Sequence, residues 1–295
     1  MATLKELKQK ISSVKNTQKT TRAMKLVSTA KLKRAEEAIF RSKEYAKKIS
    51  EVMREISTKL ASVNESVNLR AFSKINNVEK IDLIVITADK GLCGGFNIQT
   101  IKQTIAVIEE LKEKKIKIRL KVIGKKAIEY FKFVGIEMYE EVIGLSASPN
   151  YERSLEIIHK SYEDFVNGEI DNIITIYNGY VNKLTQQVYV KELLPIKPIE
   201  VEVNETHEFL EVEPSEDYET ILETLVKKYI EYSLYYALLD SLAAEHSARM
   251  QAMDAATNNA KEMVHRLTLD FNKARQEAVT RELIEIVTAI EAMKK

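Results

Sequence analysis

The feature that most constrains the fold of this 295-residue chain is the absence of glycine and proline from both of its ends. Neither residue occurs at positions 1–90 or 215–295, and all eight glycines and four prolines lie between Gly91 and Pro214. Because glycine and proline are the residues that interrupt helices, we expect one long helix at each terminus and a compact region between them.

Apolar residues of the N-terminal segment recur at alternating steps of three and four over positions 4–14 and again over 32–63. This heptad is typical of a coiled coil, and the spacing of Thr3 and Glu6 predicts a capping box at its start. Between the two apolar stretches the seam positions turn polar, at Gln18, Thr21, Lys25 and Ser28. A helix that needs only its partner helix has no reason to weaken its seam there, so the interpretation is that residues 16–25 contact another molecule.

The first 35 residues carry ten Lys and Arg residues against Glu6 alone, although the whole chain has a formal net charge of only +1. A run of charge can be a solvated helix face, or it can mark an acidic partner such as a ring of carboxylates or phosphates. Proteins that bind single-stranded nucleic acid interleave aromatic residues with the basic ones, and none precedes Phe40. The sequence therefore favours a protein partner over nucleic acid.

The C-terminal segment keeps one seam, with steps of four and three that never slip, from Tyr218 to Ala278. A helix of about 80 residues is roughly 120 Å long and needs a partner along its length. The N-terminal helix, paired antiparallel, is the partner that we expect. On this seam His246 is interpreted as a packed residue and not as a ligand.

A difference in length between the two helices predicts an overhang. Paired from a common base, the C-terminal helix is expected to extend about 17 residues, or roughly 25 Å, beyond its partner, starting near Val279. From that residue the apolar positions change phase and spread around the helix. A helix end that is apolar on most sides is expected to be buried in another molecule.

The middle of the chain alternates strands with helices. Residues 81–87, 118–123 and 170–177 are short, β-branched runs typical of buried parallel strands, and 184–194 predicts an antiparallel strand. The predicted fold class is α/β, with a long antiparallel coiled coil of the terminal helices and a central Rossmann-like domain that has a mostly parallel sheet. The predicted divisions are an N-terminal coiled-coil helix at 1–67, a Rossmann-like domain at 78–200 and a C-terminal coiled-coil helix at 215–295.

Signals for catalysis are weak. The turn GLCGGF follows the first strand, where a phosphate loop would lie, but its GxxGG spacing is neither GxGxxG nor a loop ending in GK[ST]. Close packing of a helix against a strand explains these glycines better. No catalytic residue, cofactor site or metal-ligand spacing is predicted, and the single cysteine, Cys93, indicates a reducing compartment. No apolar signal core precedes the first helix.

Several motifs, spread in order over the whole chain, closely resemble the gamma subunits of F-type ATP synthases. They are NTQKTTRAMKLVSTAKLKRA (16–35), DKGLCGGFN (89–97), LLPI (193–196), SARMQAMDAATNNA (247–260) and NKARQEAVTRELIEIV (272–287).

The resemblance implies roles for individual residues. Met24 matches the residue of the family that faces a lever loop of the beta subunit. The residues that match contacts with the catch loops of the beta subunit are Arg249, Gln276, Thr280 and Glu282. The apolar end implied to lie in a hydrophobic sleeve includes Leu283, Ile286, Val287 and Ile290. A loose match (FLEVE) implies a contact with the c-ring at Phe209 and Glu213.

The resemblance also implies a function. Such a chain is a non-catalytic rotor that couples ion flow to ATP synthesis or hydrolysis, with three alpha and three beta subunits, the epsilon subunit and the c-ring as partners. It is peripheral to the membrane, at the cytoplasmic face of the inner membrane, and it needs neither nucleic acid nor a small-molecule substrate. The alternatives that remain are a coiled-coil scaffold with a nucleotide-binding-like domain, an enzyme that dimerises through its helices, and a basic-helix nucleic-acid binder.

Overall fold

The computed structural model describes residues 3–63, 70–73, 75, 77–197 and 218–293, with the backbone alone for 57–63 and 218–219. Two long helices are present, α1 (Leu4–Val63) and α5 (Tyr218–Met293). The capping box is confirmed, because Glu6 N donates to Thr3 Oγ1 at 3.3 Å and Thr3 N donates to Glu6 Oε2 at 3.0 Å. Ser215, which follows Pro214 and precedes two acidic residues, is the N-cap that the sequence predicts for the C-terminal helix, and it lies outside the described residues.

The elements between these helices follow the order expected from the sequence. The helix that follows Pro149 begins at Tyr151, because the side chain of Asn150 accepts a hydrogen bond from Arg153 N and caps it. The elements are a short 3₁₀ turn η1 (Arg70–Phe72), β1 (Lys80–Ile86), α2 (Phe96–Glu113), β2 (Lys117–Ile123), α3 (Lys125–Val134), β3 (Glu140–Val142), α4 (Tyr151–Val166), β4 (Asn172–Tyr180) and β5 (Gln186–Leu194).

The five strands form one sheet in the order β3-β2-β1-β4-β5. Neighbouring strands from β3 to β4 are parallel, and β5 pairs antiparallel with β4. All residues of β1 after Lys80 are buried, as expected for a strand covered on both faces. The predicted fold class is thus confirmed.

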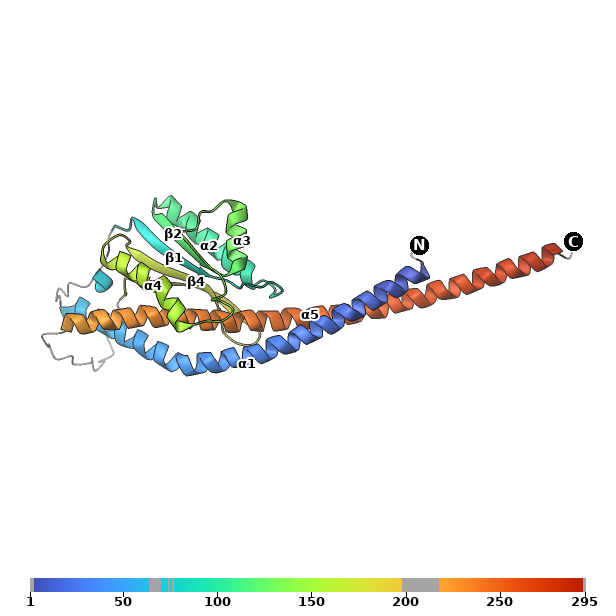
Figure 1. The fold of residues 1–295 in the computed structure, drawn as a ribbon, viewed down its shortest axis with the longest axis horizontal. Coiled ribbons are helices and arrows are strands. Elements are labelled where there is room, and N and C mark those ends of the chain that lie inside the picture. Colours follow the sequence, from blue (N-terminus) through green and yellow to red (C-terminus); the bar gives the residue numbers. More distant parts are fainter. Residues whose placement is uncertain (1–2, 64–69, 74, 76, 198–217, 294–295) are drawn as a thin grey trace. The chain divides into compact units, whose positions relative to one another are not determined.

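Helices lie on both faces of the sheet (Figure 1). Alternate residues of β1 belong to two separate cores, which explains why the strand is apolar on both sides. Leu83 and Val85 pack under α2 and α3. Ile84 and Ile86 face a core that includes α4 and parts of α1 and α5. The terminal helices therefore complete one face of the sheet as well as pairing with each other.

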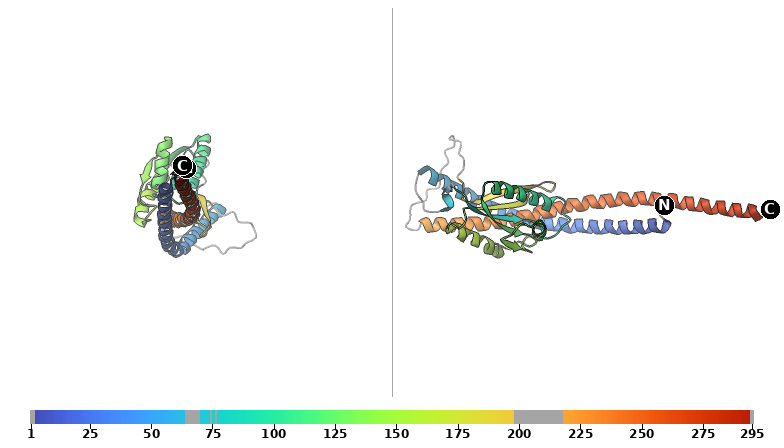
Figure 2. Two further views of the ribbon diagram at one scale, coloured as in Figure 1. Left: turned by 90° about the vertical axis from the view of Figure 1, so that its right-hand side faces the viewer. Right: turned by 90° about the horizontal axis from the view of Figure 1, so that it is seen from above.

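The chain divides into two compact units, and both long helices contribute to each. Unit 1 contains Met1–Ser28 and Arg249–Lys295, and unit 2 contains Thr29–Ala248. Within unit 1, α1 and α5 lie side by side and antiparallel, with Thr21 next to Thr257 (Figure 2). The predicted three-part division at 1–67, 78–200 and 215–295 stays a prediction.

Candidate interaction surfaces

The seam of unit 1 lies at the positions that the heptad predicts. On α1, Leu7 and Ser28 are buried, and the seam positions between them are partly buried. On α5, Met253 and Ala260 are buried, and the partly buried positions continue with the same alternation to Ala278. The two helices thus cover one another along the predicted stripe.

The polar part of the α1 seam faces α5, so its polarity has a partner within the chain, and a contact of residues 16–25 with another molecule stays a prediction. Thr257 Oγ1 donates to Thr21 Oγ1 at 2.8 Å. Lys25 Nζ donates to Asp254 Oδ1 at 2.6 Å. Thr21 and Lys25 thus each meet a polar residue on the opposite helix, a relationship that reading one helix at a time could not reveal.

Beyond the paired part, α5 continues without cover. Counting 17 residues back from Thr21 gives Leu4, the first residue of α1, and counting 17 forward from Thr257 gives Ala274. Ala278 is the last partly buried residue, and every described residue from Val279 to Met293 is exposed. The overhang therefore begins where the length difference placed it.

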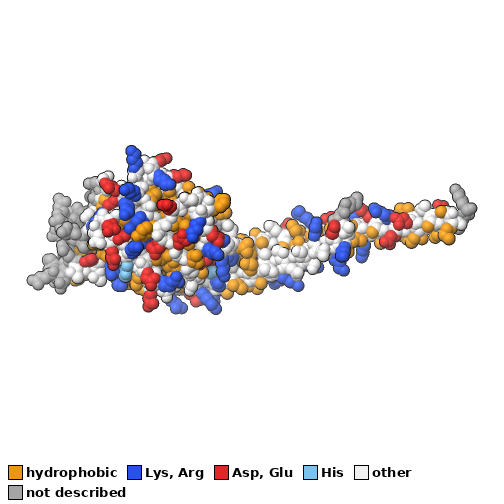
Figure 3. Space-filling model, turned by 45° about the horizontal axis from the view of Figure 1, so that its top comes forward, with side chains coloured by type: hydrophobic (Ala, Val, Ile, Leu, Met, Phe, Trp, Pro, Cys, Tyr) orange, Lys and Arg blue, Asp and Glu red, His pale blue; other side chains and the backbone are white. Residues whose placement is uncertain are grey.

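Apolar side chains are spread along the visible face of the exposed segment, between charged ones (Figure 3). Thr280 and Thr288 add to this character, because their hydroxyls donate to the carbonyls of Gln276 and Ile284 at 2.9 and 2.7 Å and leave the methyl groups outward. Large apolar side chains of this segment are between 50 and 86 % exposed: Val279, Leu283, Ile284, Ile286, Val287, Ile290 and Met293.

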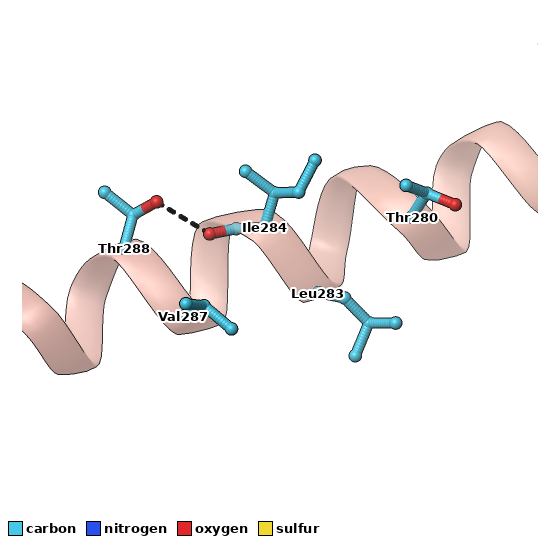
Figure 4. Close-up of a pocket in the computed structure, with 5 residues that line it drawn as sticks. All are labelled: Thr280, Leu283, Ile284, Val287 and Thr288. Carbon is cyan, nitrogen blue, oxygen red and sulfur yellow. Dashed lines mark hydrogen bonds between the residues drawn. The ribbon is translucent and has the colours of Figure 1, made fainter.

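A shallow groove runs along this segment. Its walls are Leu283, Ile284 and Val287 with the two threonines Thr280 and Thr288 (Figure 4). All five side chains come from one helix, so the groove is a bare helix surface and not an enclosed cavity. Such a surface does not enclose a small molecule, and its exposed apolar side chains are of the kind found where proteins meet.

The other contact residues predicted from the sequence differ in accessibility. Gln276, Thr280 and Glu282 are exposed on α5, and Met24 is half-buried on α1. Arg249 is only 7 % exposed, so little of its side chain is available to a partner in this conformation. Phe209 and Glu213 lie outside the described residues.

Sequence reasoning missed two apolar residues of α1 beside Met24. Leu26 and Val27 are 63 and 57 % exposed. The signal was available, because both lie off the seam positions Lys25 and Ser28. They form an exposed apolar pair on a helix whose remaining surface in unit 1 is strongly basic.

The glycine turn is used for packing, as its spacing suggested. Cys93 and Phe96 are buried against Ala244 and Ala248 of α5. Asn97 closes the turn, since its Oδ1 accepts from Ala88 N at 2.9 Å. Gly94 and Gly95 themselves are exposed, whereas Cys93 and Phe96, which lie on either side of them, belong to a core.

The start of α3, another place where an anion could bind, already holds a carboxylate. Asp89 accepts hydrogen bonds from Lys125 N at 2.9 Å and from Gly144 N at 3.0 Å. Within the described part of the chain, no group of three or more His, Cys, Asp or Glu residues could hold a metal ion. Among the same residues, no helix has a stretch long and apolar enough to cross a membrane.

Comparison with known proteins gives matches over the whole length. The family model described as "ATP synthase" matches residues 3–293. The ATP synthase gamma chain of Nautilia profundicola is 88 % identical over 295 residues, and that of Campylobacter curvus is 55 % identical over 295 residues. In both cases all of this chain and all of the relative are covered.

Solved structures with this fold come from ATP synthases of more distant organisms. One is from the mitochondrial ATP synthase of Euglena gracilis, with a TM-score of 0.63, 17 % identity, and 98 % of this chain and 94 % of that chain covered. Another is from a structure of the Tetrahymena thermophila mitochondrial enzyme described as central stalk and c-ring. Its TM-score is 0.58 at 24 % identity, with 80 % of this chain and 99 % of that chain covered. At these identities the likeness is one of fold.

Proposed function

We propose, from the premise that this chain belongs to the family of ATP synthase gamma chains, that its two long helices form the rotating central shaft of the F1 sector. It is a non-catalytic subunit of that complex. The observation that carries the proposal is the exposed apolar segment from Val279 to Met293. A partner protein that encloses this segment would remove its apolar surface from water.

The partners of this shaft are three alpha and three beta subunits around it, and the epsilon subunit and c-ring at its base. ATP synthase is a membrane-associated complex, and we assign this chain to the cytoplasmic face of the inner membrane, peripheral and held through the other subunits. Ion flow through the c-ring turns the chain, and the turning drives ATP synthesis or, in reverse, ATP hydrolysis turns the ring.

The bearing consists of Leu283, Ile286, Val287 and Ile290, enclosed in an apolar sleeve of the ring. Full burial of an exposed side chain of this size contributes about 1.5–3 kcal/mol, and because these side chains are 51 to 58 % exposed, enclosing each one contributes roughly half of that range. Such contacts are non-directional. They hold the end of the shaft on its axis without fixing one angle, as a bearing requires.

The contacts that depend on the rotation angle of the shaft are made by polar side chains and by the asymmetric shape of the two helices. Met24 faces a lever loop of a beta subunit, with the exposed lysines and arginines of α1 toward its acidic residues. Gln276, Thr280 and Glu282 contact the catch loops, each contributing roughly 1–3 kcal/mol, the upper value only for a charged partner. Arg249 can join them only by leaving its buried position.

The coupling itself is a shift of populations. The shaft presents a different face to each beta subunit in turn, and each face favours one of the open, loose or tight states by differential contact. No chemical step occurs on this chain. Its part is to be stiff, asymmetric and correctly placed along the axis of the ring.

The proposal is tested by co-expressing the chain with its alpha and beta subunits. We expect a complex of three alpha, three beta and one copy of this chain. With Lys112→Cys as the attachment point for a bead, in a Cys93→Ser background, ATP should drive rotation in one direction. A complex of different stoichiometry, or steady ATP hydrolysis with a stationary bead, contradicts the shaft. Tight binding of ATP by the isolated chain through residues 89–97 supports the alternative of a nucleotide-binding scaffold.

A further inference from the structure

The polar part of the seam contains two cross-helix contacts close together. Thr21 and Thr257 meet through their hydroxyls at 2.8 Å, and Lys25 and Asp254 form an ion pair at 2.6 Å. All four residues belong to unit 1. They lie between apolar layers, with Leu7 and Ile11 toward the start of α1.

An apolar seam with a strict repeat does not by itself fix how far one helix slides along the other. A slide of one heptad, seven residues or about 10 Å, places every apolar seam residue opposite another seam position. Polar residues at a few seam positions remove this ambiguity, because they are satisfied in one register only.

Sliding α1 by one heptad toward the C-terminal end of α5 would disrupt both of these contacts. It would place Thr21 opposite Val264, so that the Thr21 hydroxyl loses its contact with Thr257 and keeps only its bond to the carbonyl of Gln18. It would also place Lys25 opposite Lys261, seven residues beyond Asp254, so that an attraction becomes a repulsion. The slide in the other direction places Thr21 opposite Met250.

We propose that Thr21, Lys25, Asp254 and Thr257 act as a register lock that fixes the axial position of α1 against α5. They are positioning residues, since they touch each other and not the catalytic sites. The lock sets where the overhang begins after Ala278 and where Met24 stands relative to the contact residues of α5. This consequence rests on the proposed function, whereas the lock itself does not.

The register can be read in the isolated full-length chain by competition between two disulfides. Counting 14 residues from the Thr21–Thr257 contact pairs Leu7 with Phe271, and the slide toward the end of α5 pairs Leu7 with Ala278. A chain with Leu7→Cys, Phe271→Cys and Ala278→Cys, in a Cys93→Ser background, offers both bonds at once. Trypsin separates the two α5 cysteines, because Lys273 and Arg275 lie between them.

The parent chain should form mainly the 7–271 bond. Lys25→Asp should raise the share of the 7–278 bond about three- to fivefold, the effect of a half-exposed ion pair, because residue 25 then repels Asp254 and attracts Lys261. The exchange Lys25→Asp with Asp254→Lys should return the ratio part of the way toward the 7–271 bond, because residue 25 then attracts position 254 again but still attracts Lys261 in the slid register. Lys19→Asp, an exposed change on the same helix, should leave the ratio unchanged.

A second variant tests the register lock in case Lys25→Asp fails to fold. Thr21→Val, Lys25→Leu, Asp254→Leu and Thr257→Val together make the seam apolar, and this chain should be helical yet form both bonds. If the ratio of the two bonds in Lys25→Asp and in the fourfold variant equals that of the parent, the register lock is wrong.

The same variants in the assembled complex test the consequence for coupling. Lys25→Asp should lower the ratio of proton pumping to ATP hydrolysis, and the exchanged pair should raise it again toward the parent value. A parent complex that never couples would overturn the proposed function and leave the disulfide result standing. A changed bond ratio with unchanged coupling would overturn the consequence alone.

Discussion

Asp89 holds Gly144 in place: its Oδ2 accepts a hydrogen bond from Gly144 N at 3.0 Å, while its Oδ1 accepts one from Lys125 N at 2.9 Å. One carboxylate thus joins the turn after β1 to the start of α3 and to the loop after β3. In nucleotide-binding folds this edge of the sheet is open to a ligand. Here a side chain of the protein supplies the negative charge that the start of a helix attracts.

Asp89→Ala should therefore destabilise the chain. Two backbone N–H groups lose their acceptor, and the free energy of unfolding should fall by about 1–3 kcal/mol. Chemical denaturation of the full chain measures it. Glu137→Ala removes an exposed acidic residue from the same domain and should change stability by less than about 0.5 kcal/mol. Equal effects of the two changes would show that the bridge contributes nothing.

Gly124→Ala should be among the most harmful single changes in the sheet domain. The φ angle of Gly124 is +111°, and an added Cβ would lie 2.1 Å from the carbonyl oxygen of Thr87. Gly135 is the matched control, with a φ of +80° and open space around it. Gly135→Ala should cost about 1–2 kcal/mol from the backbone alone, and Gly124→Ala about 3 kcal/mol or more, because the clash adds to it. Thermal unfolding of both variants separates the two causes.

The carboxylate of Glu231 should make the stability depend on acid pH. Its side chain is 2 % exposed. Its carboxylate forms hydrogen bonds with His159 Nε2 at 2.5 Å, the Tyr151 hydroxyl at 2.8 Å and Lys228 Nζ at 2.8 Å. Burial works to raise the pKa of Glu231, but the hydrogen bonds from Lys228, His159 and Tyr151 outweigh it and hold the pKa below its ordinary value of 4.5.

Because the pKa of Glu231 is lower in the folded chain than in the unfolded chain, the ionised carboxylate stabilises the fold above pH 4.5, and this contribution is lost as the pH falls below that value. Glu231→Gln should cost about 1–3 kcal/mol near pH 7 and progressively less in acid. Glu223→Gln, an exposed change on the same helix, should cost little at either pH. A penalty for Glu231→Gln that does not shrink in acid would contradict the ionised state.

Features that follow from a repeating pattern of residues could be predicted from the sequence. Contacts between particular residues that are far apart in the chain could not. Apolar residues that recur at steps of three and four indicate which face of α5 is covered, so the end of the seam at Ala278 could be predicted. The partners of Thr21 and Lys25 depend on the register between two distant segments, which neither helix contains alone. For that reason the same polar residues were interpreted as a surface for another protein.

The glycine turn illustrates the opposite case. The spacing of its glycines matches no nucleotide motif, and this could be seen in the sequence. The residues next to Asp89 in the sequence, however, give no indication that its carboxylate binds the start of α3. Its role depends on Lys125 and Gly144, 36 and 55 residues away. Burial of Arg249 was likewise hidden, because a charged residue on a long helix is ordinarily expected at the surface.

Met24→Lys should impair coupling more than assembly. Met24 is half-buried on α1 next to the exposed Leu26 and Val27, and a lysine there can extend outward and bind an acidic lever loop. One charge-assisted contact of about 1–3 kcal/mol that exists at only some angles would hold the shaft at those angles. ATP-driven proton pumping should fall more than ATP hydrolysis does. Met24→Leu keeps the volume and should behave like the parent; failure of Met24→Lys to assemble at all would contradict this role of Met24.

The exposed end of α5 should make the isolated chain associate with itself. Ile286 and Ile290 are 56 and 51 % exposed one helical turn apart, and without a sleeve such residues find one another. Changing both to Ser should weaken self-association about tenfold or more, because each buried isoleucine contributes about 1.5–3 kcal/mol. Helix content should change little, since Ile and Ser have similar helix propensities. Sedimentation at several concentrations measures the association, with Glu285→Ser as the control in the same segment. If the double variant associates as the parent does, the contact lies elsewhere; if it associates less but still assembles equally tightly with the alpha and beta subunits, the end of α5 is not the bearing.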